Sequence, residues 1–280
     1  MEVTQYCYAK VNLFLEVLDK RPDGYHDLFT LFQKVKCYDQ LSAEQSSSLI
    51  LEGGDGITQI PEENLIIKAA ILIKKQFQVT SGIKFTLNKK LPVGAGLGGG
   101  SANAAMAIKL CNTIWKLNLP IETLIEIGAK LGADVPFFLY KGTAFATGIG
   151  EQLYSAPPPC QFYLVIATPK CFVSTEKAYA GISPNKTPFF KSFQQEYQKK
   201  YMIPSFYACL KNDFEDSILA QNPQIKLLHD SISSFKSIKT LLCGSGASVF
   251  GLFEEKSVAQ ACESAIRSEC RFSCVTEFQD

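Results

Sequence analysis

The chain has 280 residues, of which 46% are hydrophobic and 20% charged, and its formal net charge is +1. This length allows one large or two ordinary domains, and the apolar share is enough for a substantial core, which excludes global disorder. The near-neutral charge argues against nucleic acid as the main partner, because proteins that bind duplexes usually carry a basic excess.

Ten cysteines and two histidines bear on metal sites, disulfides and location. The cysteines are scattered, no Cys-x-x-Cys pair occurs, and most lie among apolar residues. We therefore expect reduced, buried thiols, with neither a zinc site nor a disulfide framework. The first residues are too polar for a signal peptide, and no apolar stretch reaches the roughly 18 residues that span a bilayer. These features predict a soluble, cytoplasmic protein.

The first predicted elements form a hairpin. Residues 9–17 and 28–35 are apolar runs that predict strands, and "RPDGYHD", residues 21–27, has the chemistry of a turn. The turn places Tyr25 and His26 at the tip of the hairpin. An aromatic residue in a turn is usually unremarkable, so this feature alone predicts no site.

Two polar residues lie within the first of these strands. Its period of two places Lys10 and Asn12 on the same side. A lysine between apolar neighbours commonly keeps its ammonium in water at the rim of a sheet, and taken alone we favour that interpretation.

A helix and a strand follow. Residues 64–77 have helical spacing, with Asn64 as a plausible N-cap. Residues 82–92 contain a clean alternation and predict a strand. Its apolar side consists of Ile83, Phe85 and Leu87.

A glycine-rich segment, "LPVGAGLGGGS", runs directly into a helix predicted from about Ser101 to Leu117. It satisfies Gly-x-Gly-x-x-Gly, but residues 101–121 contain no Asp or Glu for the ribose of a dinucleotide, so a Rossmann site is a poor match. The Walker A pattern also fails, because no lysine precedes Ser101.

The physical basis of an anion site survives both failures. Glycines let several N–H groups converge without a Cβ in the way, and the helix start adds unpaired N–H groups and the positive end of its dipole. Charge neutralisation must then come from another lysine or from bound Mg²⁺. The alternatives are a flexible linker, which the adjacent helix disfavours, and a loop that serves close packing.

Two further segments contain chemically suggestive residues. In "LGADVPFFLYKG", after a second helix predicted beyond Pro120, Asp134 either caps the next segment or is a base in a dry site. In "LLCGSGASVFGLF", residues 244–246 either close a hairpin or offer N–H groups to an anion.

The remaining elements predict a second domain. Residues 142–153 indicate two short strands, and three prolines within 154–161 mark a boundary, giving domains 1–155 and 156–280. The second domain is α+β, with helices against an antiparallel sheet. Its predicted elements are strand 162–168, several helices within 174–235, strands 240–246 and 248–253, helix 257–268 and strand 272–278.

The Lys10–Asn12 strand with its turn, the glycine loop, the Asp134 segment and the 244–250 segment occur together and in this order. This arrangement resembles the GHMP superfamily of small-molecule kinases, whose central loop is the lysine-free P-x-G-x-G-L-G-G-G-S. Within it, the R-x-D-G-Y-H turn, "GADVPFF" and "GSGASVF" resemble the signature of the 4-diphosphocytidyl-2-C-methyl-D-erythritol kinase family.

The resemblance implies a GHMP kinase fold: an N-terminal domain like the second domain of ribosomal protein S5, a C-terminal ferredoxin-like domain, and the site between them. It implies transfer of the γ-phosphoryl group of ATP to the 2-hydroxyl of a cytidine-diphosphate-linked methylerythritol, in the non-mevalonate route to isoprenoid precursors. Mg²⁺ is expected with its protein ligands left open, and the chain is expected to be a monomer or a homodimer with no nucleic-acid or membrane partner.

The resemblance also implies roles for single residues. Asp134 would be the general base and Lys10 its cationic neighbour. The loop would hold the ATP phosphates with Pro92, Val93, Gly94, Ala95, Gly96, Leu97, Gly98, Gly99, Gly100, Ser101 and Ala102.

Four residues would face the substrate: Asn12, Tyr25, His26 and Tyr179. Because residues in a turn keep their backbone groups out of a sheet ladder, we expect residue 26 to read the edge of cytosine, and Tyr25 to stack on the base. Phe172 is a further candidate contact for a base.

Three alternatives stay open. Another GHMP kinase, acting on homoserine or mevalonate, lacks the R-x-D-G-Y-H turn. A non-catalytic GHMP-like ligand-binding protein would be expected to have lost Lys10 or Asp134, and both are present. A Rossmann dehydrogenase is a distant third.

Overall fold

The computed structural model describes residues 2–54, 58, 60, 63–182 and 189–279. Its contacts divide the chain into two compact units. Unit 1 comprises Met1–Ala9, Tyr38–Val93 and Gly98–Lys141, and unit 2 comprises Lys10–Cys37, Gly94–Leu97 and Gly142–Asp280. Because these units are defined by contact and interleave along the chain, they do not test the division at residue 155, which stays a prediction.

Two long strands contribute to both units. Strand β1 (Val3–Lys20) and strand β2 (His26–Ser46) are paired and joined by a turn, in which Arg21 N donates to Tyr25 O at 2.8 Å. The predicted hairpin is confirmed. Both strands are longer than predicted, because their outer stretches mix exposed polar and aromatic residues and lack a continuous apolar run.

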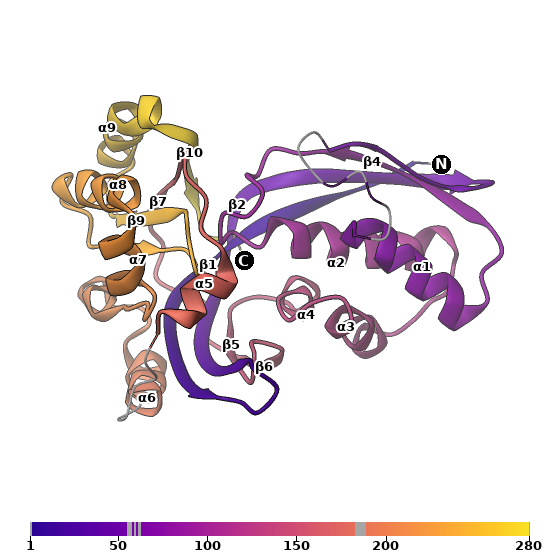
Figure 1. Cartoon of the computed structure of the whole chain (residues 1–280), viewed down its shortest axis with the longest axis horizontal. Helices are drawn as coiled ribbons and strands as arrows, with labels where there is room; N and C mark the ends of the chain where they lie inside the picture. Colours follow the sequence, from indigo (N-terminus) through magenta and orange to yellow (C-terminus); the bar gives the residue numbers. More distant parts are fainter. Residues whose placement is uncertain (1, 55–57, 59, 61–62, 183–188, 280) are drawn as a thin grey trace. The chain divides into compact units, whose positions relative to one another are not determined.

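Unit 1 places helices against strands. Within it, residues 40–46 of β2 pair antiparallel with β4 (Gly82–Asn88), and β3 (Leu49–Gly53) pairs parallel with β4. The apolar side of β4 is buried, as its alternation predicts. Figure 1 shows helices α1 (Leu65–Phe77) and α2 (Gly99–Ile114) together on one face of these strands.

The helices of unit 1 begin where their caps allow. Asn64 Oδ1 accepts from Ile66 N at 2.9 Å, which confirms the predicted cap of α1. Helix α3 (Ile121–Ala129) follows Pro120 as predicted. Helix α4 (Val135–Leu139) has only five residues, all buried, and its apolar sequence without helical periodicity gave no helix signal.

Unit 2 contains a ferredoxin-like sheet. Strands β7 (Tyr163–Pro169), β8 (Lys239–Leu242), β9 (Val249–Phe253) and β10 (Cys270–Glu277) lie in the order β10-β7-β9-β8, with all neighbours antiparallel. This is the strand order that the βαββαβ connectivity produces, and it confirms the expected ferredoxin-like architecture. Strands β5 (Ala144–Thr147) and β6 (Gln152–Ser155) pair with each other, as predicted, and β5 also pairs with residues 30–32 of β2.

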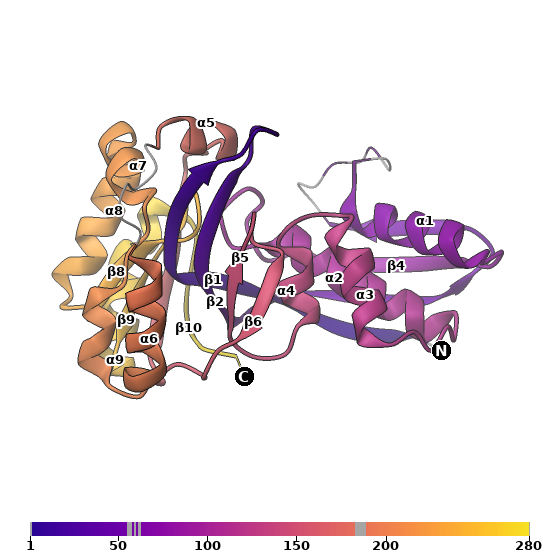
Figure 2. The same cartoon turned by 90° about the horizontal axis from the view of Figure 1, so that it is seen from below.

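Helices cover the ferredoxin-like sheet. Helices α8 (Pro223–Ser234) and α9 (Lys256–Ile266) pack on it, as Figure 2 shows. The other helical segments of unit 2 are α5 (Thr175–Ala180), α6 (Phe190–Lys200), η1 (Pro204–Cys209), α7 (Glu215–Gln221) and η2 (Arg267–Glu269). Of the stretch 184–204, which matches no motif, residues 184–188 lie outside the described residues.

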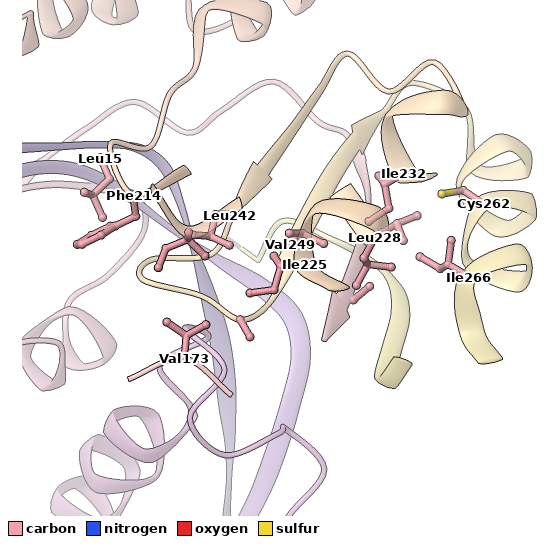
Figure 3. Close-up of a cluster of buried hydrophobic side chains, with 14 of the residues drawn as sticks. Leu15, Val173, Phe214, Ile225, Leu228, Ile232, Leu242, Val249, Cys262 and Ile266 are labelled. Carbon is pink, nitrogen blue, oxygen red and sulfur yellow. The ribbon is translucent and has the colours of Figure 1, made fainter. Parts of the chain in front are cut away.

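The core of unit 2 lies between these helices and the sheet (Figure 3). Ile225, Leu228 and Ile232 recur on one face of α8 at helical spacing, and Cys262 and Ile266 face them from α9. Each fully buried aliphatic side chain contributes about 1.5–3 kcal/mol. This core fixes β8 and β9 and the connection between them, residues 243–248.

The cysteines are free thiols. Cys7, Cys111, Cys243 and Cys262 are buried as expected, and burial raises the pKa of Cys7 to about 12 and that of Cys262 to about 11. The expectation of burial is wrong for Cys209, which is exposed at the end of a short 3-10 helix. In the part of the chain that the structure describes, no helix is long and apolar enough to cross a membrane.

Candidate active site

Lys10 is held by a chain of buried hydrogen bonds in unit 2. Its Nζ donates to Asn12 Oδ1 at 2.8 Å, and Asn12 Nδ2 donates to Thr30 Oγ1 at 2.8 Å. Thr30 Oγ1 in turn donates to Phe14 O at 2.7 Å. The predicted same-side placement of Lys10 and Asn12 is confirmed. Lys10 is only 5% exposed, so the interpretation as a solvated rim lysine is wrong.

The ammonium of Lys10 also lies over an aromatic ring, with Nζ 4.9 Å from the centroid of Phe32. Burying an ammonium costs free energy because it loses its hydration, unless it is hydrogen-bonded or paired. The bond to Asn12 and the contact with the Phe32 ring replace part of that hydration. Burial raises the pKa of the neighbouring Cys243 thiol well above its ordinary value, although Lys10 opposes that effect. The Cys243 thiol is therefore neutral.

Three separate segments of unit 2 meet at Lys10. A methyl group built on Gly244 would lie 3.5 Å from Lys10 Nζ, Asn12 Oδ1 and Gly96 O alike. Lys10 N donates to Leu97 O at 3.0 Å. Strand β1, the first half of the glycine loop and the 244–246 turn are thus brought together.

The glycines of these segments are required by geometry. Gly96 has φ +78°, and a side chain there would collide with the carbonyl of Cys243. Gly244 and Gly246 have φ +56° and +91°. Since L-residues rarely adopt such angles, only glycine lets the loop and the turn approach this closely. The loop therefore has a close-packing role on its first half, in addition to any role in binding.

The second half of the loop forms the start of α2 in unit 1. Gly98 is the N-cap, with φ +69°, and no side chain caps the helix there. The first turn, Gly99–Ala102, contains no acidic residue. The first N–H groups of a helix have no intrahelical acceptor and lie at the positive end of its dipole, so this start is suited to an anion.

A buried charge network, which no sequence pattern predicted, holds this helix start in place. Asp39 is fully buried; its Oδ2 accepts from Lys89 Nζ at 2.6 Å and from Asn103 Nδ2 at 3.0 Å. Its Oδ1 accepts from Lys90 N and Leu91 N, both at 2.7 Å. A single carboxylate thus ties the end of β4 to the first turns of α2. The only sequence signal is an aspartate amid a half-apolar strand, which is too weak to use.

Asp134 precedes α4 in unit 1 and is half-buried. Its side chain makes no capping hydrogen bond to α4, so the helix-cap interpretation lacks the bond that defines it. Asp134 belongs to unit 1 and Lys10 to unit 2, and their pairing in catalysis stays a prediction. Among the described residues, no group of three or more His, Cys, Asp or Glu is placed to hold a metal ion.

The aromatic residues near the hairpin tip differ in exposure. Tyr25 is 61% exposed, whereas His26 is buried and opens β2, with its ring stacked on that of Tyr179 at 5.2 Å. Tyr179 also packs edge-on against Phe214 at 4.8 Å. The structure thus brings His26 and Tyr179 together and leaves the Tyr25 ring in solvent. The expectation that the turn residues stay out of a sheet ladder is wrong for His26, the first residue of strand β2. Tyr25 lies in the turn, where its N donates to Asp23 Oδ1 and its O accepts from Arg21 N.

Phe172 lies at the glycine loop. It is exposed, and a side chain on Gly94 would overlap its ring. An aromatic ring is therefore present beside the first glycine of the loop, which is consistent with the candidate contact for a base.

Known domain families match both halves of the chain. The family described as GHMP kinases N terminal domain matches residues 64–142, and GHMP kinases C terminal matches residues 203–271. These matches contain the helix start, the Asp134 segment and the 244–246 turn.

Relatives match over nearly the whole length. The 4-diphosphocytidyl-2-C-methyl-D-erythritol kinase of Syntrophus aciditrophicus is 39% identical over 266 residues, 92% of each chain. The enzyme of that name from Chlorobium chlorochromatii is 36% identical over 262 residues, 91% of this chain and 89% of the relative.

Solved structures agree with these relatives. A crystal structure of 4-(cytidine 5'-diphospho)-2C-methyl-D-erythritol kinase superposes with a TM-score of 0.83 at 30% identity, covering 99% of this chain and 100% of that one. Homoserine kinase from Cytophaga hutchinsonii superposes with a TM-score of 0.77 at 18% identity over 99% of this chain and 94% of that one, which shows the shared fold alone. The expected GHMP kinase fold is confirmed, and the chain belongs to the 4-diphosphocytidyl-2-C-methyl-D-erythritol kinase family of the GHMP kinases, which use ATP as the phosphoryl donor.

Proposed function

We propose that the chain is an ATP-dependent, cytoplasmic kinase that phosphorylates the 2-hydroxyl of 4-diphosphocytidyl-2-C-methyl-D-erythritol, in the non-mevalonate route to isoprenoid precursors. Family membership supports the substrate. The observation that carries the assignment of the site is the meeting of Lys10, Gly96 and Gly244 in unit 2, three residues from distant segments around one buried ammonium.

The glycine loop is proposed to hold the phosphates of ATP. Residues 92–102 combine positive-φ glycines with a helix start that has neither an acidic residue nor a side-chain cap. Backbone N–H donors at such a start favour phosphate oxygens. Mg²⁺ is proposed to accompany these phosphates with its protein ligands left open, since it is usually bound through one or two carboxylates together with substrate phosphates and water.

The chemistry asked of the side chains is small. Phosphoryl transfer passes through a loose transition state, in which positioning and charge stabilisation dominate. Asp134 is proposed to accept the proton of the substrate's 2-hydroxyl. As this proton leaves, the 2-oxygen bonds to the γ-phosphorus of ATP, and the bond between the γ-phosphorus and the β–γ bridging oxygen breaks to release ADP. Lys10 is proposed to stabilise the negative charge that develops, from a position fixed by Asn12 and Thr30.

The cytidylyl group is proposed to bind where Asn12, Tyr25, His26 and Tyr179 lie. His26 and Tyr179 already form a stacked pair, and Tyr25 presents an exposed ring. Backbone groups of residue 26 are proposed to read N3 and N4 of cytosine, with Tyr25 against the base.

A coupled ADP-release assay tests the function. We expect turnover with 4-diphosphocytidyl-2-C-methyl-D-erythritol and none above background with homoserine or mevalonate. Preferential turnover of homoserine or mevalonate would replace the proposal with one of the other GHMP activities. No turnover of any of the three would favour a non-catalytic ligand-binding protein.

The cytosine-reading role makes a specificity prediction. Uracil reverses both edge groups, and a site built to pair polar groups rejects an analogue that leaves them unpaired by about 10⁴-fold in favourable cases. We therefore expect strong discrimination in kcat/KM against the uridine analogue. Tyr25→Ala should raise KM for the cytidylyl substrate, since a stacked base is worth roughly 1–3 kcal/mol, and leave KM for ATP nearly unchanged. Equal use of both substrates would refute the reading of cytosine.

The general-base role makes a rate prediction. Asp134→Asn keeps size but does not take up the proton, and we expect kcat to fall by about 10²–10⁴-fold with little change in Tm. Lys10→Met should lower kcat similarly, and the double variant should be little worse than either single one, because residues that act as a unit are non-additive. An Asp134→Asn variant that melts much earlier and keeps its specific activity would return Asp134 to a structural role.

A further inference from the structure

We propose that Asn212 is a positioning residue of the kinase: its side-chain amide fixes the 244–246 turn against Lys10 and the glycine loop. Asn212 acts through the turn, because its side-chain amide bonds to Leu242, Gly244 and Phe214. Its kinetic consequence rests on the proposed function, whereas its structural consequence is testable without any substrate.

Asn212 holds the turn through its carbonyls. Its Nδ2 donates to Leu242 O and to Gly244 O, both at 2.8 Å, so one amide group grips the residues on either side of Cys243. Its Oδ1 accepts from Phe214 N at 3.0 Å. The residue is 4% exposed, and both amide protons and the amide oxygen are engaged.

Asn212 is itself fixed to the strand that contains Lys10. It forms an isolated parallel bridge with Leu15, in which Leu15 N donates to Lys211 O at 2.9 Å and Asp213 N donates to Leu15 O at 3.1 Å. Asp213 Oδ2 also accepts from Val17 N at 2.8 Å. Asn212 therefore links the 244–246 turn to β1 by a short path of hydrogen bonds.

The same segment contacts the turn a second time. Glu215 Oε1, three residues after Asn212, accepts from Leu242 N at 3.1 Å. Leu242 thus has its carbonyl held by Asn212 and its N–H held by Glu215. Other backbone bonds lie within the 243–248 connection or reach the glycine loop: Cys243 N to Ser248 O at 2.8 Å, Gly246 N to Cys243 O at 2.9 Å, and Ser248 N to Ala95 O at 3.2 Å. The side chain of Ser245 is also hydrogen-bonded, with its Oγ 3.1 Å from Thr175 Oγ1 at the start of α5.

A shift of the turn would reach the reacting groups directly. The Cα of Gly244 faces Lys10 Nζ, Asn12 Oδ1 and Gly96 O. Misplacing a catalytic group by about 1 Å typically costs on the order of 10²-fold in rate, even when the responsible mutation is distant. The hydrogen bond from Asn212 to Gly244 O therefore fixes the backbone that lies beside the Lys10 ammonium.

The test compares Asn212→Asp with a matched control, Asn222→Asp. The first variant keeps the acceptor for Phe214 N but points a carboxylate oxygen at two carbonyl oxygens. Asn222 also donates from Nδ2 to a carbonyl, that of Ile218 at 2.8 Å, so its variant loses a similar bond in the same unit without a bond to the turn. Asn212→Ser serves as a milder, uncharged variant with a single donor, in case Asn212→Asp does not fold.

Hydrogen exchange followed by mass spectrometry supplies the readout that needs no substrate. We expect amides of residues 242–248 to exchange at least about 10-fold faster in Asn212→Asp, or in Asn212→Ser, than in the wild type or Asn222→Asp. Unchanged exchange in this peptide, in variants that fold, would overturn the brace whatever the enzyme turns over.

Kinetic constants distinguish a positioning role from a purely structural one, because replacing a purely structural residue would lower stability without lowering kcat. We expect kcat of Asn212→Asp to fall by about 10²-fold while KM for ATP changes little. The buried carboxyl should be partly protonated at low pH and then donate to one carbonyl, so the ratio of variant to wild-type rate should rise as pH falls. A loss of Tm without a loss of kcat, as expected for Asn222→Asp, would make Asn212 structural only.

Discussion

The start of α2 in unit 1 and the 244–246 turn in unit 2 are both rich in glycine, and each is held by one buried side chain, here called its brace. Asp39 is the charged brace of the helix start, and Asn212 is the neutral brace of the turn. Asp39 meets the ammonium of Lys89 at 2.6 Å and also binds two backbone N–H groups. Asn212 meets only backbone groups, through a neutral amide. Glycine lets each segment lie close to its neighbours, but it has no side chain that could anchor the segment. A residue from another part of the chain must therefore hold each segment in place.

The two braces should fail in different ways. Removing one partner of a buried ion pair leaves an uncompensated charge, which typically costs about 3–5 kcal/mol. Removing a neutral amide leaves unsatisfied polar groups, which cost about 1–3 kcal/mol. A single substitution in the charged brace should therefore lower the free energy of unfolding more than one in the neutral brace. Removing the second charge as well should restore more of that loss.

The largest effect is expected where a glycine is replaced and no brace can compensate. A methyl group at Gly96 would collide with Cys243 O, in addition to the cost of about 1–2 kcal/mol for an L-residue at φ +78°. We expect Gly96→Ala to lose kinase activity and to lower Tm strongly, as measured by the ADP-release assay and calorimetry. Gly142→Ala is the matched control, since Gly142 has φ +82° and nothing within 4 Å of the added methyl group.

The difference between these two alanine variants isolates the collision from the backbone strain. If both variants lost the same small amount of stability, the glycine loop would have room to move away from the 243–248 connection. The close approach of these segments would then be a preference and not a requirement.

The charged brace is tested by Asp39→Asn. The new amide group would face Lys89 Nζ and Asn103 Nδ2, both donors, and we expect a loss of about 3–5 kcal/mol in the free energy of unfolding. Asp39→Asn with Lys89→Met should recover part of that loss, because no ammonium is then left unpaired. Denaturant unfolding of the three proteins measures both effects.

An exposed ion pair of the same unit is the control. Lys84 and Glu52 are paired at 3.0 Å but remain 31% and 55% exposed, so Lys84→Met should change stability by less than about 1 kcal/mol. Equal losses for Asp39→Asn and Lys84→Met would contradict the distinction between buried and exposed charge on which the comparison depends.

Much of the fold follows from local pattern. The alternation of Ile83, Phe85 and Leu87 predicts β4, and Asn64 marks the start of α1, because each signal lies within a few residues of the element that it specifies. The side-by-side placement of Lys10 and Asn12 follows from the period of a strand. The failures are also physical: α4 has five residues, all buried, so no periodicity could distinguish it.

The braces were not predictable in the same way. Asp39 acts on Leu91, 52 residues away, and Asn212 on Gly244, 32 residues away. Both effects depend on tertiary pairing, which no local pattern encodes. The burial of Lys10 likewise depends on Thr30 and Phe32 across the hairpin, so the strand pattern alone favoured a solvated lysine.

The smallest effect concerns a charge at the edge of the neutral brace. Glu215 Oε1, which accepts from Leu242 N, also lies 3.5 Å from His229 Nε2. The hydrogen bond to Glu215 raises the pKa of His229 above 6.5, against the opposing effect of burial, and further support comes from Asp230 on α8 and a backbone group of Thr240 on β8. The folded state therefore binds a proton more tightly than the unfolded state, so this contribution to stability is complete below pH 6.5 and is lost as pH rises through the raised pKa.

We expect His229→Gln to lower Tm by on the order of 2 °C at pH 5.5 and by less at pH 8.5, as measured by calorimetry at both values. His229 is partly exposed, so solvent screening keeps the effect small. Lys226→Gln, which breaks an exposed pair with Asp230 on the same helix, controls for the change in net charge. An identical pH dependence in the wild type and His229→Gln would show that the pair of His229 and Glu215 adds nothing to stability, and that Glu215 holds Leu242 N without help from His229.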